Sequence, residues 1–197
     1  MIIGMMKNNL PVYMQGISKT PLDSRNTRLN LQNATPRSTF YNETTGNANI
    51  ELHTAGPLQC GIKKTGGPNV AFNSATFSLK KPAAGANGTI RAHYWSSTNP
   101  TTGSSAVSTG AATAITSLST SYTDVTFTWL SDKLFRIGDR ITVRYVSGSW
   151  DTGITAPFME NDSATTTTDY SLCTANSIGN GVWTDTSTQS PVMTADS

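Results

Sequence analysis

Apolar side chains alternate with polar ones at every second residue in several segments of this chain, and this period most constrains its fold. The segments are 49–53, 75–80, 89–94, 124–129 and 140–145. Successive side chains of a strand point to opposite faces, so the pattern predicts strands that bury one face. In one of these segments Trp129 is in phase with Val125 and Phe127. We therefore expect Trp129 in the core.

Turn-forming residues separate these segments. They include Gly66-Gly67-Pro68, Asn87-Gly88, Asn99-Pro100 and Asn180-Gly181. Glycine and asparagine reach the backbone angles of tight turns at little steric cost, and no segment shows the 3.6-residue period of a helix. Short alternating strands joined by polar turns predict an all-β fold, an antiparallel β-sandwich whose topology we expect to be a jelly roll.

Hydroxyl groups replace charge on the polar face. The chain has 197 residues, of which 13% are charged, while 32 threonines and 22 serines make up about 27%. A typical soluble domain has about 25% charged residues. The net charge of +2 is mild and the basic residues are scattered, with Arg25, Arg28 and Arg37 as the nearest cluster. We expect no nucleic-acid partner and, because no run of about 20 apolar residues occurs, no membrane span.

Three regions differ in their pattern. Residues 1–48 lack periodicity, residues 49–183 carry the strand pattern, and residues 184–197 are rich in hydroxyls. We interpret them as an extended N-terminal arm, a β-sandwich and a polar C-terminal tail. The apolar residues of the arm are expected to contact other subunits; they are Leu10, Val12, Tyr13, Leu29, Leu31, Phe40 and Tyr41. The alternative is an N-terminal strand within the chain's own sheet.

The N-terminus bears on localisation. The apolar stretch 1–6 is shorter than the apolar region of a signal peptide, and no basic residue precedes it. A hydroxyl-rich, charge-poor surface is nevertheless typical of a protein outside the cell. We expect a virion component, with an extracellular or cell-surface protein as the alternative. Cys60 and Cys173 can form one disulfide or remain free, and a reducing cytoplasm favours free thiols.

Four segments together resemble a known type of domain. They are Ala75–Lys81, Gly88–Ala92, Leu118–Phe127 and Ile137–Val143. Over about residues 70–146 the chain resembles jelly-roll β-sandwich domains of viral structural proteins and of carbohydrate-binding or adhesive modules. The resemblance lies in strand and turn residues, and it implies a fold but no catalytic residues.

The aromatic residues suggest a glycan-binding site. On the strand from Thr89, Trp95 is in phase with His93 and Arg91, opposite to the apolar face. An exposed tryptophan beside hydrogen-bonding side chains can hold a sugar ring, and Trp150 and Trp183 lie near glycine-rich loops. The alternative is that these tryptophans cap the core or pack in a subunit contact.

Catalytic and metal-binding signals are weak. The chain has no zinc-protease, nucleophile-elbow or phosphate-loop motif, and its two histidines lie on separate strands. We therefore expect no enzymatic activity and no cofactor. Glu160 and Asp162 offer oxygen ligands for a hard cation such as calcium, but the regular calcium loop is missing, so we expect no metal site.

These observations favour a non-enzymatic structural protein of a virus, a capsid, decoration or spike component that assembles through its N-terminal arm. Its partners would be copies of itself and other virion proteins, and a cell-surface glycan remains an option. One alternative is a carbohydrate-binding or adhesive module. Another is the subunit of an extracellular filament, which donates its N-terminal segment as a strand to the next subunit.

Overall fold

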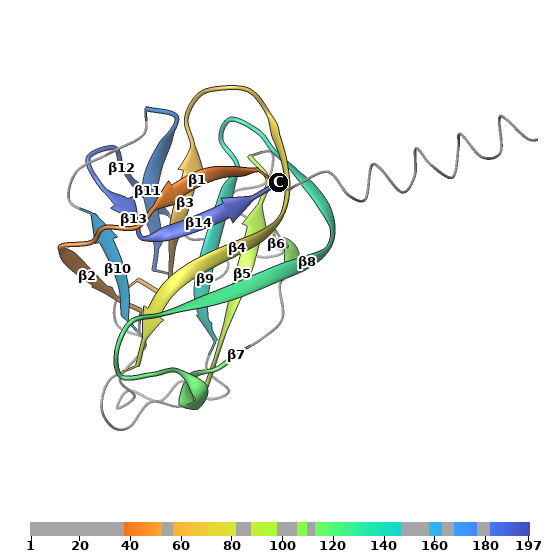
Figure 1. The fold of residues 1–197 in the computed structure, drawn as a ribbon. Coiled ribbons are helices and arrows are strands. Elements are labelled where there is room, and N and C mark those ends of the chain that lie inside the picture. The colour runs from red at the N-terminus through yellow and green to blue at the C-terminus, as the bar shows by residue number, and fades with distance from the viewer. Residues whose placement is uncertain are drawn as a thin grey trace, which may run out of the picture. The chain divides into compact units, whose positions relative to one another are not determined.

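The computed structural model describes residues 38–52, 57–81, 88–97, 106–109, 113–146, 158–162, 168–176 and 182–197. The part of the chain from Ser38 to Ser197 forms one compact unit. It is all-β, with two antiparallel sheets packed face to face as a sandwich, so the expected fold class is confirmed (Figure 1).

Sheet A contains seven strands. They are β1 (Thr39–Glu43), β2 (Ala48–Glu51), β4 (Val70–Lys80), β8 (Thr123–Phe135), β10 (Phe158–Asp162), β13 (Ser190–Pro191) and β14 (Met193–Asp196). Strand β14 lies between β1 and β4, and β4 pairs along most of its length with β8. Strand β10 joins the end of β4 and also pairs with β2 and β13.

Sheet B also contains seven strands, which lie behind β4 and β8 in Figure 1. They are β3 (Gln59–Lys64), β5 (Thr89–Trp95), β6 (Ala106–Thr109), β7 (Thr113–Ala114), β9 (Arg140–Val146), β11 (Tyr170–Ala175) and β12 (Trp183–Thr186). Their order is β12-β11-β3-β9-β5-β6, and β7 pairs with β5. These strand orders do not by themselves establish a jelly roll, which stays a prediction.

Helix contributes little to the described chain. A single 3₁₀ turn, η1 (Ile115–Ser117), follows β7. Within the described ranges, no helix has the length and apolar character needed to cross a membrane.

Aromatic rings fill the space between the sheets. Phe72 on β4 packs edge-on against Trp129, Tyr94 and Phe135, with ring centroids 5.2, 5.5 and 5.7 Å apart. Trp129 is 2% exposed. Its predicted place in the core is therefore confirmed, and the edge-to-face packing adds to the free energy gained by burial.

The end of the chain is a central strand and not a polar tail. Strand β14 pairs with both β1 and β4, and Met193 and Ala195 are 2% and 0% exposed. The predicted boundary at residue 184 is therefore wrong. Only two apolar residues alternate here, and one of them is an alanine, so the strand leaves too short a pattern to recognise.

The predicted arm boundary at residue 48 is also wrong, because β1 belongs to the same sandwich. Tyr41 is 1% exposed and its hydroxyl donates to the carbonyl oxygen of Pro191 at 3.0 Å. Phe40 packs against Phe72 and Phe135. Tyr41 is a core residue and the half-buried Phe40 packs against the core, so both contact this chain's own sandwich and were wrongly predicted as subunit contacts. The other predicted contacts lie outside the described residues; they are Leu10, Val12, Tyr13, Leu29 and Leu31.

The pairing register of β3 and β11 keeps the two cysteines apart. Cys60 pairs with Thr174, whereas Cys173 pairs with Gly61, so the cysteines point to opposite faces of sheet B. Both thiols are free and buried, as expected, and burial raises the pKa of each well above its usual value. Joining them requires a one-residue slip of β11 against β3, which would turn every side chain of one strand to the wrong face.

The role of β14 can be tested by one pair of substitutions. Ala195→Asp buries an unpaired carboxylate between the sheets and should lower the free energy of unfolding by 3 kcal/mol or more, an order-of-magnitude value. Thr194→Asp places the same charge on the outward phase of the same strand and should have a much smaller effect. Urea unfolding followed by circular dichroism measures both. Equal, small losses would show that the segment does not pack as a central strand.

Candidate functional site

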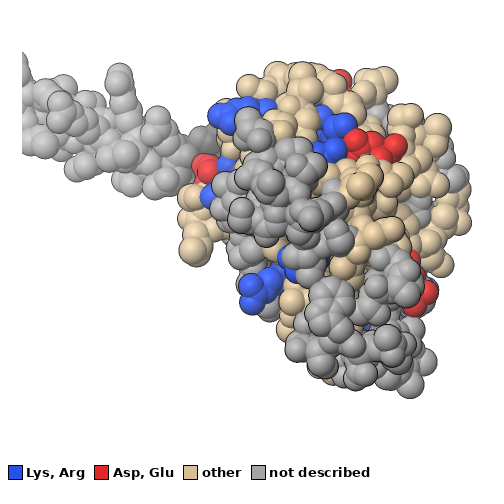
Figure 2. All heavy atoms as spheres, turned by 180° about the vertical axis from the view of Figure 1, so that it is seen from behind, with Lys and Arg blue, Asp and Glu red and all other residues tan. Residues whose placement is uncertain are grey.

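The outer face of sheet B carries polar and charged side chains that are mostly buried. The strand registers arrange them in three rows. The first row is Arg91, Arg144, Gln59, Ala175 and Trp183. The second is His93, Thr142, Gly61, Cys173 and Asp185. The third is Trp95, Arg140, Lys63 and Ser171. In Figure 2, which shows the molecule from the side of this sheet, a basic patch borders an acidic one.

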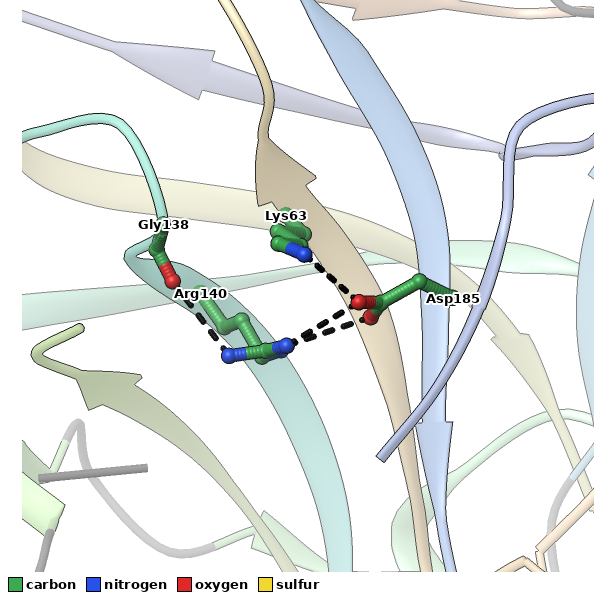
Figure 3. Close-up of polar contacts among 4 residues, drawn as sticks. All are labelled: Lys63, Gly138, Arg140 and Asp185. Atoms are coloured by element: carbon green, nitrogen blue, oxygen red, sulfur yellow. Dashed lines mark hydrogen bonds and ion pairs between the residues drawn. The ribbon is translucent and has the colours of Figure 1, made fainter. Parts of the chain in front are cut away.

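Asp185 is the centre of an ion-pair cluster (Figure 3). Lys63 Nζ donates to Asp185 Oδ2 at 2.6 Å, and Arg140 donates from one nitrogen to both carboxylate oxygens at 3.3 and 3.1 Å. The other terminal nitrogen of Arg140 donates to the carbonyl oxygen of Gly138 at 3.3 Å. The Arg140 side chain is only 8% exposed. Lys63 and Asp185 are 27% and 29% exposed, so solvent screens their pair in part, and the charge-assisted bonds link β12 to β3 and β9 across β11.

Aromatic rings extend this cluster across the sheet. The guanidinium carbon of Arg140 lies 4.7 Å from the centroid of the Trp183 ring, a cation–π contact. Trp183 meets Trp95 edge-on at 5.7 Å, and Trp95 stacks on His93 at 5.5 Å with 18° between the ring planes. Trp95 Nε1 donates to the hydroxyl of Thr142 at 3.0 Å. The rings are thereby fixed in orientation.

Unsatisfied polar atoms concentrate on the same face. Six buried side-chain nitrogen or oxygen atoms of the described residues have no hydrogen-bond partner, and five of them are here. They are both ring nitrogens of His93, Nε of Arg140, Nε of Arg144 and Oγ of Ser171. Buried polar groups are normally paired, because an unpaired one keeps its full desolvation penalty. Their concentration makes the outer face of sheet B the candidate functional site.

Two arginines dominate the electrostatics next to His93. Arg91 and Arg144 occupy directly opposed positions on β5 and β9. Within the described chain, neither makes an ion pair, and burial together with the charge of Arg91 lowers the pKa of Arg144. Burial, then Arg144, then Arg91 lower the pKa of His93 to about 3. At neutral pH its imidazole is therefore neutral and offers one donor and one acceptor.

The predicted glycan-binding residues come together only in part. Trp95, His93 and Trp183 form one aromatic cluster, and Arg91 lies exposed at its side. Trp95 and His93 are only 3% and 4% exposed, however, so an open tryptophan platform is wrong. Alternation shows which face a side chain points to but not whether that face is covered. Trp150 lies outside the described residues.

Sequence reasoning missed the residues that organise this face. Arg140 and Arg144 are on the polar phase of a predicted strand, and pairing that strand with 89–94 would have placed Arg144 opposite Arg91. Asp185 lay in the presumed tail, with no pattern to connect it to Arg140. Lys63 and Gln59 lie on β3, which does not alternate.

The metal candidates lie on another sheet. Glu160 and Asp162 both belong to β10 in sheet A, and the side chain of Asp162 is not described. Among the described residues, no three His, Cys, Asp or Glu side chains cluster closely enough to hold a metal ion. The geometry therefore directs attention to sheet B.

The lowered pKa of His93 predicts a specific acid sensitivity. The unfolded chain takes up a proton near pH 6.5, whereas the folded protein does so only near pH 3, so acid favours the unfolded state across this window. Wild type should lose about 2 to 3 kcal/mol between pH 7 and 4.5 relative to His93→Gln, at about 1.4 kcal/mol per pH unit. Urea unfolding at several pH values measures the difference. Parallel pH profiles would show that His93 is not buried in its neutral form.

Comparison with known proteins identifies no family for this chain. Neither the protein-family models nor the curated proteins give a match to the chain. The likeness to jelly-roll domains therefore stays a prediction, and the function must be argued from the geometry.

Proposed function

We propose that this chain is a non-enzymatic structural subunit of a virus particle, a capsid, decoration or spike component that associates with copies of itself. The observation that supports the proposal best is the long edge strand β8. It has 13 residues and pairs with β4 on one side, and no other described strand pairs with it.

The first part of β8, from Thr123 to Thr128, lacks the usual protection against pairing with another chain, because the register shift against β4 comes only after Thr128. Leu130 is fully exposed and Leu134 is 40% exposed. Between Thr123 and Leu130 the only charged residue is Asp124. Native proteins normally protect an exposed edge with charges, proline or a bulge. Beyond Thr128 the register with β4 is interrupted until Lys133, and beyond Ser131 the edge carries charge. The residues Thr123–Thr128, next to the exposed Leu130, are therefore the part suited to accept a strand.

The N-terminal segment of a second copy is the partner that best suits this edge. The 37 residues before Ser38 can span up to about 120 Å when extended, which is enough to reach a neighbouring subunit. An extended segment that adds to an edge strand gains main-chain hydrogen bonds, and its alternate side chains provide specificity. Low charge favours such packing, because strong repulsion between identical copies would oppose it.

The two alternative functions, a filament subunit and a carbohydrate-binding module, differ in how well the observations support them. A filament subunit with a donated N-terminal strand would use the same edge, so only the symmetry of the assembly separates it from a closed particle. A carbohydrate-binding module with an open Trp95 platform loses support, because that ring is buried against His93 and Trp183. Electron microscopy of the native assembly distinguishes shells from filaments.

Removing residues 1–37 tests the donated segment. The cut stops before Thr39 because β1 belongs to the sandwich. The shortened chain should fold with an unchanged circular dichroism spectrum and should remain monomeric in light scattering after size exclusion. Full-length protein under the same conditions should associate. If the shortened chain assembles like the full chain, the N-terminal segment is not the connector.

A charge introduced on the exposed edge of β8 tests whether this edge accepts a strand from another copy. Leu130→Lys should weaken association by at least tenfold without reducing stability, because the side chain is already in solvent. Val182→Lys makes the same change at another exposed apolar residue, 83% exposed, and serves as the matched control. Analytical ultracentrifugation measures both. Equal effects of the two variants, or no effect of either, would contradict a role for the β8 edge.

A further inference from the structure

The first observation concerns the arginine pair Arg91 and Arg144. They face each other across β5 and β9, where opposed side chains lie within about 5.5 Å at Cβ. Like charges at this distance repel. The pKa of Arg144 is lowered first by burial and then by the charge of Arg91. The nearest acidic group in the rows, Asp185, is already bound by Lys63 and Arg140. A negative group placed between the two arginines would relieve the repulsion.

The second observation is the state of His93. It is 4% exposed, and neither ring nitrogen has a hydrogen-bond partner. The residue paired with His93 on β9 is Thr142. The hydroxyl of Thr142 donates to Gln59 and accepts from Trp95, so it is already used. Stacking on Trp95 fixes the ring plane. A rigid imidazole with an unused donor and an unused acceptor matches a group that both accepts and donates, such as a hydroxyl.

The third observation is the access to this pair. Arg91 is exposed and Arg144 is half-buried, with its Nε atom buried and unpartnered. Arg91 is therefore open to solvent, while the Nε–H group of Arg144 and the neighbouring ring of His93 are desolvated. Guanidinium groups bind planar or tetrahedral oxyanions through paired hydrogen bonds, and such bonds strengthen when water is excluded.

We propose that Arg91, Arg144 and His93 form a binding site for an acidic sugar, an oxyanion carried on a hydroxyl-bearing ring. The two arginines bind the oxyanion and His93 exchanges hydrogen bonds with a neighbouring hydroxyl. The oxyanion can be the carboxylate of a uronic acid or a phosphate ester. This site does not depend on assembly through β8, which belongs to the other sheet.

Calorimetric titration of the full chain with four probes tests the site. The probes are a galacturonic acid trimer, its methyl ester, galactose 6-phosphate and inorganic phosphate. The trimer or the sugar phosphate should bind at least tenfold more tightly than the ester or inorganic phosphate, and the better of the two identifies the oxyanion. Equal binding of the ester, equal binding of inorganic phosphate, or no binding of either acidic sugar at millimolar concentration would overturn the proposal.

Substitutions of Arg91, Arg144 and His93 test whether these residues bind the acidic sugar. Arg91→Gln and Arg144→Gln should each weaken binding at least tenfold, and loss of one of two repelling charges should not lower the melting temperature. His93→Gln should weaken binding of the acidic sugar more than that of inorganic phosphate. Lys133→Gln removes a charge from β8 in sheet A and is the control. Binding that falls equally in Lys133→Gln, or that survives both arginine variants, would place the ligand elsewhere.

Discussion

The arrangement of the outer face of sheet B depends on how the guanidinium group of Arg140 is held. It is bound on one side by the carboxylate of Asp185 and covered on another by the ring of Trp183, so that β12 is tied to β9 although β11 and β3 lie between them. This contact brings Trp183 against Trp95, and Trp95 in turn orients His93. A fixed polar layer covers the sheet as a result.

This layer contains groups that stability alone would not retain. Two opposed arginines repel each other, and the imidazole of His93 is buried without a partner. A sheet optimised only for folding would place opposite charges or apolar residues at such positions. Proteins tend to break the rules of local stability at functional sites, where a ligand supplies the missing interactions. Cys173 lies in the same layer, but its buried, protonated thiol is inert.

The sequence predicts the fold well wherever one face of a strand is exposed. The alternation around Phe77 and Phe127 identifies strands β4 and β8 because their outward phase is threonine and serine in solvent. Thr76 and Thr126 illustrate this, with hydroxyl oxygens 2.8 Å apart. The segments Gln59–Lys64 and Tyr170–Ala175 show no such alternation because β3 and β11 are buried on both faces.

The site was harder to predict than the fold. Strand phase places Arg91, His93 and Trp95 on one face, which the structure confirms. Which strands lie beside them depends on long-range pairing, and the ion pair between Arg140 and Asp185 joins residues 45 positions apart. Whether the outer face is covered depends on tertiary packing, and for that reason the burial of Trp95 could not be predicted.

The two sheets thus carry different features of the proposed function. The edge of sheet A is suited to accept a strand from another copy, and the outer face of sheet B presents two opposed arginines beside a neutral histidine. A particle built from such subunits would join its copies through one sheet and contact acidic sugars through the other. Assembly of identical copies favours a low overall charge, whereas binding of an acidic sugar needs basic residues close together.

The most direct measurement of the central claim is a nitrogen NMR spectrum of the His93 ring and the Arg144 Nε–H group at pH 7, with and without the galacturonic acid trimer. The account predicts a neutral imidazole in the free protein and shifts of both groups when the trimer binds. A protonated His93 in the free protein, or shifts that occur only at other residues, would contradict it.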